Sequence, residues 1–162
     1  MIIKGLITED FVNYKKPSLT IMMPRCSFKC DKESGCDLCQ NSHLVNEPDI
    51  VIEDVEEFID KYYIQNDITE SVVFQGLEPF DTFDDLYRFI QIFRSKSDDD
   101  IVIYSGYNKD EIQEYINLLH GFKNIIIKLG RYIPNRSARY STHLGVQLSS
   151  DNQYSINLNE EM

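Results

Sequence analysis

Residues 71–129 read SVVFQGLEPFDTFDDLYRFIQIFRSKSDDDIVIYSGYNKDEIQEYINLLHGFKNIIIKL, and this stretch determines the architecture. Three short apolar runs rich in β-branched residues, 71–75, 101–104 and 125–129, predict buried strands. Between them, 82–94 and 108–119 repeat apolar residues at helical spacing. Strands joined by amphipathic helices of this length form right-handed βαβ units. The stretch therefore predicts a mostly parallel sheet.

The same reasoning extends to both sides of this stretch. Leu19–Met23 predicts a further buried strand, and Glu53–Tyr63 predicts a helix with Val55, Phe58, Ile59 and Tyr62 inward. Residues 145–148 and 154–158 are short strand candidates. We expect one domain over residues 1–162, because nothing in the chain resembles a linker or a repeat. Eight βα units do not fit in this length, so the expected fold is α/β, a partial, open βα barrel.

Composition and charge limit the functions to be considered. The 162 residues are 42% hydrophobic, with 9 Phe and 10 Tyr, which predicts a folded core. The formal net charge of −11 disfavours nucleic acid as a partner, because phosphate backbones would be repelled. No apolar run is long enough to span a bilayer, and the first residues do not have the pattern of a signal peptide. We expect a cytoplasmic protein with no membrane partner.

The four cysteines of the chain lie within residues 26–39: Cys26, Cys30, Cys36 and Cys39. In a reducing cytosol such a cluster favours metal or redox chemistry over disulfides. Thiolates bind zinc or iron–sulfur clusters. A structural zinc site would use all four sulfurs, with its two pairs usually further apart than here. A cluster held by three cysteines would instead leave one iron open to a ligand.

Two later segments follow strand ends. Gly76-Leu-Glu78-Pro79 comes after the strand at 71–75, and Ser105-Gly106-Tyr107 comes after the strand at 101–104. A glycine permits close approach of a ligand to the backbone, and a carboxylate suits a cationic ammonium. The carboxyl ends of parallel strands share one edge of the sheet. The cysteines likewise follow the strand at Leu19–Met23.

In this order the motifs resemble radical S-adenosylmethionine (SAM) activating enzymes, above all the activating protein of the anaerobic ribonucleoside-triphosphate reductase. Asp10–Asn13, the strand and the Cys-x3-Cys start resemble the opening of that family. Residues 76–79 are similar to its Gly-Gly-Glu-Pro segment, with Leu77 in place of the second glycine, and 103–107 resemble its Tyr-Thr-Gly-Tyr segment. Residues 148–153 resemble its closing Gly-Ser-x-Asn-Gln segment and are given no catalytic role. The resemblance covers about Asp10 to Leu158.

The resemblance implies that three cysteines hold a [4Fe-4S] cluster, but the spacing allows two registers. Cys26, Cys30 and Cys39 keep the x3 spacing directly after the strand and place Cys36 in an insertion. The other register uses Cys36 and Cys39 with Cys26 or Cys30. The first register is favoured, because the geometry is set next to the strand. The role of Cys36 stays open.

The resemblance also implies a reaction and its participants. Gly76, Glu78, Pro79, Ser105, Gly106 and Tyr107 would bind SAM, with Glu78 taking the amino group. The reduced cluster would cleave SAM to methionine and a 5′-deoxyadenosyl radical, which takes a hydrogen atom from a glycine of the partner reductase. No catalytic acid or base residue is implied, since the cofactor supplies the chemistry. An external electron donor such as a flavodoxin is expected.

Two other functions remain possible from the sequence. The chain is either a radical SAM enzyme that acts on another glycyl-radical enzyme or on a small molecule, or a non-enzymatic module that carries zinc or an iron–sulfur cluster. The identity of the partner separates the first of these from the activating enzyme. Anaerobic reconstitution and an assay of SAM cleavage separate the second.

Overall fold

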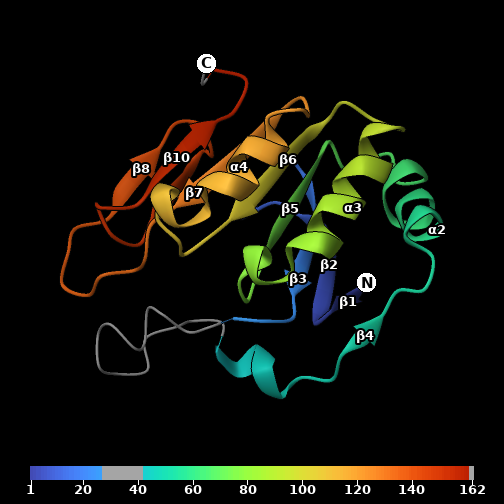
Figure 1. The fold of residues 1–162 in the computed structure, drawn as a ribbon, viewed down its shortest axis with the longest axis horizontal. Coiled ribbons are helices and arrows are strands. Elements are labelled where there is room, and N and C mark those ends of the chain that lie inside the picture. Colours follow the sequence, from blue (N-terminus) through green and yellow to red (C-terminus); the bar gives the residue numbers. More distant parts are fainter. Residues whose placement is uncertain (27–41, 161–162) are drawn as a thin grey trace.

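A six-stranded open sheet with strand order β10-β7-β6-β5-β3-β2 is the centre of the fold in the computed structural model (Figure 1). The structure describes residues 1–26 and 42–160. The four central strands are parallel to one another, and the edge strands β2 and β10 are antiparallel to their neighbours. The six strands are β2 (Gly5–Asp10), β3 (Ser18–Met23), β5 (Ser71–Gly76), β6 (Asp100–Tyr104), β7 (Ile125–Leu129) and β10 (Tyr154–Asn157).

Two small antiparallel pairs lie outside this sheet. They are β1 (Ile2–Ile3) with β4 (Ile50–Val51), and β8 (Arg139–Ser141) with β9 (Val146–Leu148). The sequence predicted the four parallel strands and, within a residue or two, β9 and β10. It did not predict β1, β2, β4 or β8. The α/β class and the mainly parallel sheet are confirmed, and no closed barrel occurs in the described part of the chain.

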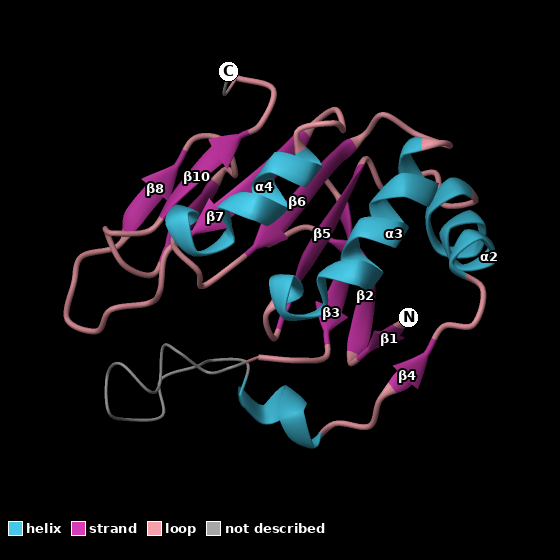
Figure 2. Cartoon of the chain, in the orientation of Figure 1, coloured by secondary structure: helices cyan, strands magenta, loops and turns pink. Residues whose placement is uncertain are grey.

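The helices cover one face of the sheet (Figure 2). They are α2 (Val55–Ile59), α3 (Phe83–Arg94) and α4 (Gln113–Leu119). Short 3-10 segments, η3 (Pro79–Thr82) and η4 (Lys109–Ile112), precede α3 and α4, and η1 (Ser42–Asn46) lies further upstream. No helix in residues 1–26 and 42–160 is both long and apolar enough to cross a membrane.

One detail of the predicted helix at Glu53–Tyr63 was wrong. After α2 the chain continues as a π-helical turn, η2 (Asp60–Ile64), which shifts the inward face by one residue. Tyr63 is therefore buried, whereas Tyr62 is only half-buried. The side chain of Thr82 makes no capping hydrogen bond to α3. Instead the carboxylate of Glu78 accepts the backbone N–H of Phe80 at the start of η3.

Side chains alternate across the sheet, as the pleat requires. Val72 and Phe74 belong to the large core beneath the helices, and Val73 belongs to a smaller cluster on the opposite face. That smaller cluster also contains Tyr14, Val102, Ile126, Leu144 and Leu148. The helix face of the sheet is therefore fully packed. The other face has a modest apolar cluster, and it also carries a cavity.

Candidate functional site

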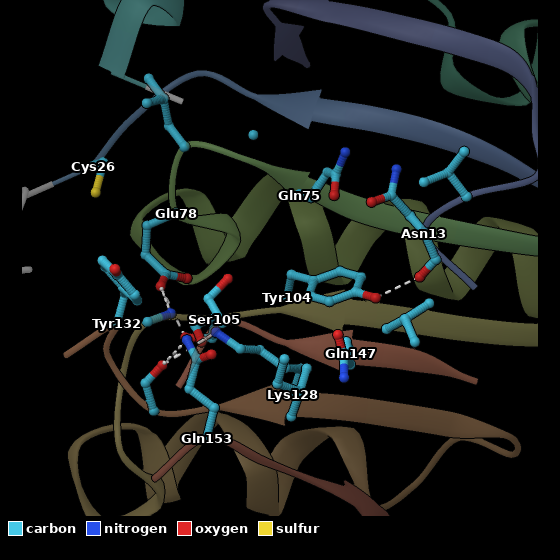
Figure 3. Close-up of a pocket in the computed structure, with 18 of the residues that line it drawn as sticks. Asn13, Cys26, Gln75, Glu78, Tyr104, Ser105, Lys128, Tyr132, Gln147 and Gln153 are labelled. Carbon is cyan, nitrogen blue, oxygen red and sulfur yellow. Dashed lines mark hydrogen bonds between the residues drawn. The ribbon is translucent and has the colours of Figure 1, made fainter. Parts of the chain in front are cut away.

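A cavity of about 640 Å³ lies where β3, β5, β6 and β7 end, on the face of the sheet opposite the helices (Figure 3). Its wall includes Cys26, Gly76, Glu78, Ser105 and Gly106. These residues come from three of the segments that the sequence singled out. The topology explains the meeting, because parallel strands bring their carboxyl ends to one edge.

The segment that leads to Cys26 is hydrogen-bonded to the segment that carries Glu78. Pairing of β3 with β5 runs to Met23 and Gly76, and beyond it the N–H of Leu77 donates to the carbonyl of Met23 at 3.2 Å. The N–H of Glu78 then donates to the carbonyl of Arg25 at 2.6 Å. This backbone ladder fixes Cys26 and Glu78 relative to each other. In Figure 3 their side chains lie at the same end of the cavity.

Gly76 is required by this ladder. Its φ is +88°, and a Cβ atom there would lie 2.9 Å from both Cα and Cβ of Met22. Only glycine accommodates both the left-handed conformation and the close approach of β3. Leu77, which stands where the resemblance expects a second glycine, is buried in the wall of the cavity.

Glu78 connects the Gly76–Pro79 segment to the Ser105–Tyr107 segment. Its Oε1 accepts the hydroxyl of Ser105 and the N–H of Gly106, both at 2.8 Å, and its Oε2 accepts the N–H of Phe80 at 3.0 Å. Only 6% of Glu78 is exposed, and this burial raises the pKa of its carboxyl to about 7 against the opposing effect of the hydrogen bonds. A carboxylate has room for about four hydrogen bonds, so one position remains for a cationic ligand.

Two of the predicted SAM-binding residues lie just behind this wall. Pro79 is buried at the first position of η3. Tyr107 is half-buried, its hydroxyl donates to Asp81, and its N–H donates to the Ser105 hydroxyl at 3.0 Å. Neither residue is among the described residues that line the cavity.

Cys26 is the one predicted cluster ligand within the described residues. It is half-exposed and follows β3 by three residues. Cys30, Cys36 and Cys39 lie outside the described residues. Among the residues that the structure does describe, no group of three His, Cys, Asp or Glu side chains is placed to hold a metal ion. A thiol in the wall of a partly enclosed cavity suits iron–sulfur ligation.

Sequence reasoning missed several residues of the wall. Lys128 projects from β7, and its Nζ donates to the carbonyls of Ser105 and Gly130, each at 3.1 Å. Gln75, Gln147 and Asn13 line the far part of the cavity. A signal was present for Lys128 and Gln75, since each is the polar residue near the end of an apolar strand.

The segment at 148–153 also reaches the cavity, although it was given no catalytic role. Gln153 is buried, and its side chain donates to the carbonyl of Gly130 and accepts the N–H of Ser150, each at 3.2 Å. Leu148 and Ser149 line the wall beside it. The segment thus closes one side of the cavity.

A lip on the opposite side is formed by the turn after β2. Asp10 is buried and accepts hydrogen bonds from the N–H of Val12, the side chain of Asn13 and the hydroxyl of Thr20. Burial alone would raise the pKa of Asp10, but these bonds outweigh it and lower the pKa. The hydroxyl of Tyr104 donates to the Asn13 carbonyl, which ties the lip to β6.

Comparison with known protein families identifies the metal centre. The sequence model of the family described as a 4Fe-4S single cluster domain matches residues 18–154, which is most of the chain. The chain belongs to this family. Neither the curated proteins nor the solved structures gave a match.

Family membership decides between the metals that the cysteines allowed. It supports a [4Fe-4S] cluster and therefore an iron–sulfur protein, rather than a structural zinc site. The matched region contains all four cysteines, the Gly76–Pro79 segment and the Ser105–Tyr107 segment.

Proposed function

We propose that this iron–sulfur protein is a radical SAM activating enzyme that generates a glycyl radical on an anaerobic ribonucleotide reductase. One observation carries the proposal. The segment that leads to Cys26, the Glu78 segment and the Ser105 segment are joined by backbone and carboxylate hydrogen bonds at one cavity. A site for a cluster beside a site for an amino-acid-like cation is what reductive SAM cleavage requires.

In this proposal Cys26, Cys30 and Cys39 would hold the cluster, and SAM would bind beside it. The bound cluster would supply one electron, which breaks a carbon–sulfur bond of the sulfonium. The protein binds both partners, orients them and limits the access of water. Cys26 fits this role, because it lies in the cavity wall at the same end as Glu78.

The proposed SAM site consists of Gly76, Glu78, Pro79, Ser105, Gly106 and Tyr107. Glu78 would accept the ammonium of SAM at its remaining acceptor position. A cation at this position would offset the cost of burying the carboxylate and would lower its pKa again. Pro79 and Tyr107 would act from behind the wall, by holding η3 and the loop after β6.

The proposed fold assignment is the partial barrel of the radical SAM type. The four parallel strands would form the barrel wall, and the cavity would lie on its inner face. An open side would let a loop of a large protein substrate reach the cavity. We further propose an external electron donor such as a flavodoxin, and a cytoplasmic location.

Anaerobic reconstitution with iron and sulfide tests the proposal. We expect visible absorption typical of an iron–sulfur cluster and release of 5′-deoxyadenosine from SAM under dithionite. Cys26→Ala, Cys30→Ala and Cys39→Ala should each abolish both signals. Stoichiometric zinc with no SAM cleavage by the wild type would overturn the proposal.

Reconstitution with an anaerobic ribonucleotide reductase should give the electron paramagnetic resonance signal of a glycyl radical. SAM cleavage without that signal would reject this partner.

The same reconstitution tests the cysteine register. Cys36→Ala should keep the cluster and SAM cleavage, because Cys36 lies in the proposed insertion. Cys30→Ala is the matched comparison and should lose both. The opposite pattern, loss with Cys36→Ala and retention with Cys30→Ala, would show that the other register is correct.

A further inference from the structure

The far part of the cavity is lined by a row of polar side chains on the open face of the sheet. Phe74 pairs with Ile103, so Gln75 and Tyr104 follow at neighbouring positions, and Tyr104 pairs with Lys128. The three side chains line the cavity together. Pairing between the strands fixes the positions of these three side chains relative to one another, so the row forms a rigid surface of the cavity.

Most polar groups of the wall are already used within the protein. Tyr104 donates to Asn13, Lys128 donates to two carbonyls, and both ends of the Gln153 side chain are bonded. Gln75 and Gln147 differ. Their side-chain amides make no hydrogen bond within the part of the chain that the structure describes. Each therefore offers two N–H donors and a carbonyl acceptor to the cavity.

The two glutamines come from opposite walls. Gln75 is half-buried near the end of β5, whereas Gln147 is exposed in the middle of β9. Figure 3 shows them on either side of Tyr104, in the half of the view away from Cys26 and Glu78. A ligand that reaches both amides must extend from the Cys26 end of the cavity into this half.

The chemistry of two amides favours a neutral ligand with alternating donors and acceptors. A polypeptide main chain has this pattern. Lys128 is the single cation in the described wall and its Nζ donates to two carbonyls, so no cluster of cations is present there to hold a phosphate-bearing ligand. The lip beside this half is apolar and exposed: Phe11 is 66% and Val12 78% exposed, and Val12 lines the cavity. An apolar lip suits a segment of another protein.

We propose that Gln75 and Gln147 form a subsite that holds the main chain of the substrate polypeptide through amide hydrogen bonds. This inference rests on the proposed function, because it takes a polypeptide glycine as the reacting group. The two glutamines are positioning residues: they would hold the main chain on either side of that glycine and take no part in SAM cleavage.

Amide NMR of the reconstituted, oxidised full-length protein with SAM tests the subsite. The probe is the capped peptide acetyl-Ala-Ala-Gly-Ala-Ala-amide. We expect it to shift the side-chain amide signals of Gln75 and Gln147. Gln75→Leu and Gln147→Leu should each weaken peptide binding about threefold to tenfold, the range for loss of a neutral hydrogen bond. Gln75→Glu keeps the side-chain shape and should also weaken binding.

The matched control is Gln91→Leu, an exposed glutamine of α3 on the helix face of the sheet, which should leave the peptide affinity unchanged. A parallel titration with adenosine tests the alternative occupant, a nucleobase. Equal peptide affinity in wild type and both glutamine variants would overturn the subsite. So would adenosine shifting the two amide signals while the peptide does not.

Failure of this inference is distinguishable from failure of the proposed function. SAM cleavage by the wild-type protein in the absence of any polypeptide is therefore measured alongside the peptide titration. If the wild type cleaves SAM but the peptide affinity is the same in the wild type and the glutamine variants, only the subsite is wrong. If the wild type does not cleave SAM, the proposed function is wrong, and the peptide titration still reports on the cavity.

Discussion

At the scale of single residues, Glu78 has the largest structural consequence. Its carboxylate caps η3 and accepts two hydrogen bonds from the Ser105–Gly106 turn, so one side chain links the ends of β5 and β6. The sequence predicted a ligand-binding carboxylate at this position. It could not predict that the same carboxylate organises the wall, because the partner segment is remote in the chain.

The raised pKa of Glu78 predicts a pH-dependent stability. Between about pH 4.5 and about pH 7 the folded state binds more protons at Glu78 than the unfolded state does, so stability falls as pH rises. The free energy of unfolding should lose about 3 kcal/mol from this group across that window. In Glu78→Gln this part of the slope should vanish, whatever the baseline stability of the variant. Denaturant titrations of the SAM-free protein at several pH values measure the slope.

The control for this prediction is Glu114→Gln, an exposed glutamate on α4. This variant should keep the wild-type pH dependence of the free energy of unfolding. A Glu78→Gln variant with the same slope as the wild type would mean that the carboxyl is not buried as described.

At the scale of elements, the turn after β2 has a larger structural role than its sequence indicates, because it forms one side of the cavity. Residues 10–13 were recognised only through a family resemblance, and β2 itself was not predicted, because its burial alternates irregularly. In the structure Asp10 organises the turn, and the Tyr104 hydroxyl anchors it to β6. Burial, followed by the charge of Asp10, raises the pKa of Tyr104, so its hydroxyl stays a donor at neutral pH.

Tyr104→Phe should therefore loosen the turn without removing the aromatic ring. Loss of this donor should cost about 1 kcal/mol in the free energy of unfolding. Hydrogen exchange should accelerate at the amides of Val12 and Asn13, which the Asp10 carboxylate accepts. Tyr140→Phe is the matched control, because that tyrosine is 61% exposed. Equal exchange in both variants would contradict the anchoring role.

Helix prediction succeeded in position and failed in detail for a physical reason. Apolar spacing located the helices, but it assumes a constant period. The π-helical turn at Asp60–Ile64 changes that period, and Tyr63 turns inward, where its hydroxyl donates to Asp99. On α3 the buried residues are Phe83, Leu86, Phe89, Ile90 and Phe93, so this helix packs more of its circumference than a single stripe.

At the scale of the whole molecule, charge is the most general property. A chain with net charge −11 attracts a cationic ligand over distances of about one Debye length, roughly 8 Å at physiological salt. If SAM is the ligand, raising the salt concentration from low to well above physiological should weaken its binding, about threefold by screening.

Isothermal titration with SAM and with S-adenosylhomocysteine measures this effect. The second ligand lacks the sulfonium charge, so its affinity should change little with salt. An equal salt dependence for both ligands would mean that overall charge does not contribute to SAM binding.

The sequence by itself determined the class of fold and the parallel direction of the central strands, and it singled out the clustered cysteines as the candidate metal ligands. Local patterns are sufficient for these, since apolar periodicity and thiol spacing are properties of nearby residues. The tertiary structure decided the rest of the cavity: the need for glycine at position 76, the carboxylate link from Glu78 to Ser105, and the presence of Lys128, Gln75 and Gln147 around one cavity. These depend on register between strands far apart in the chain, which a single sequence does not encode locally.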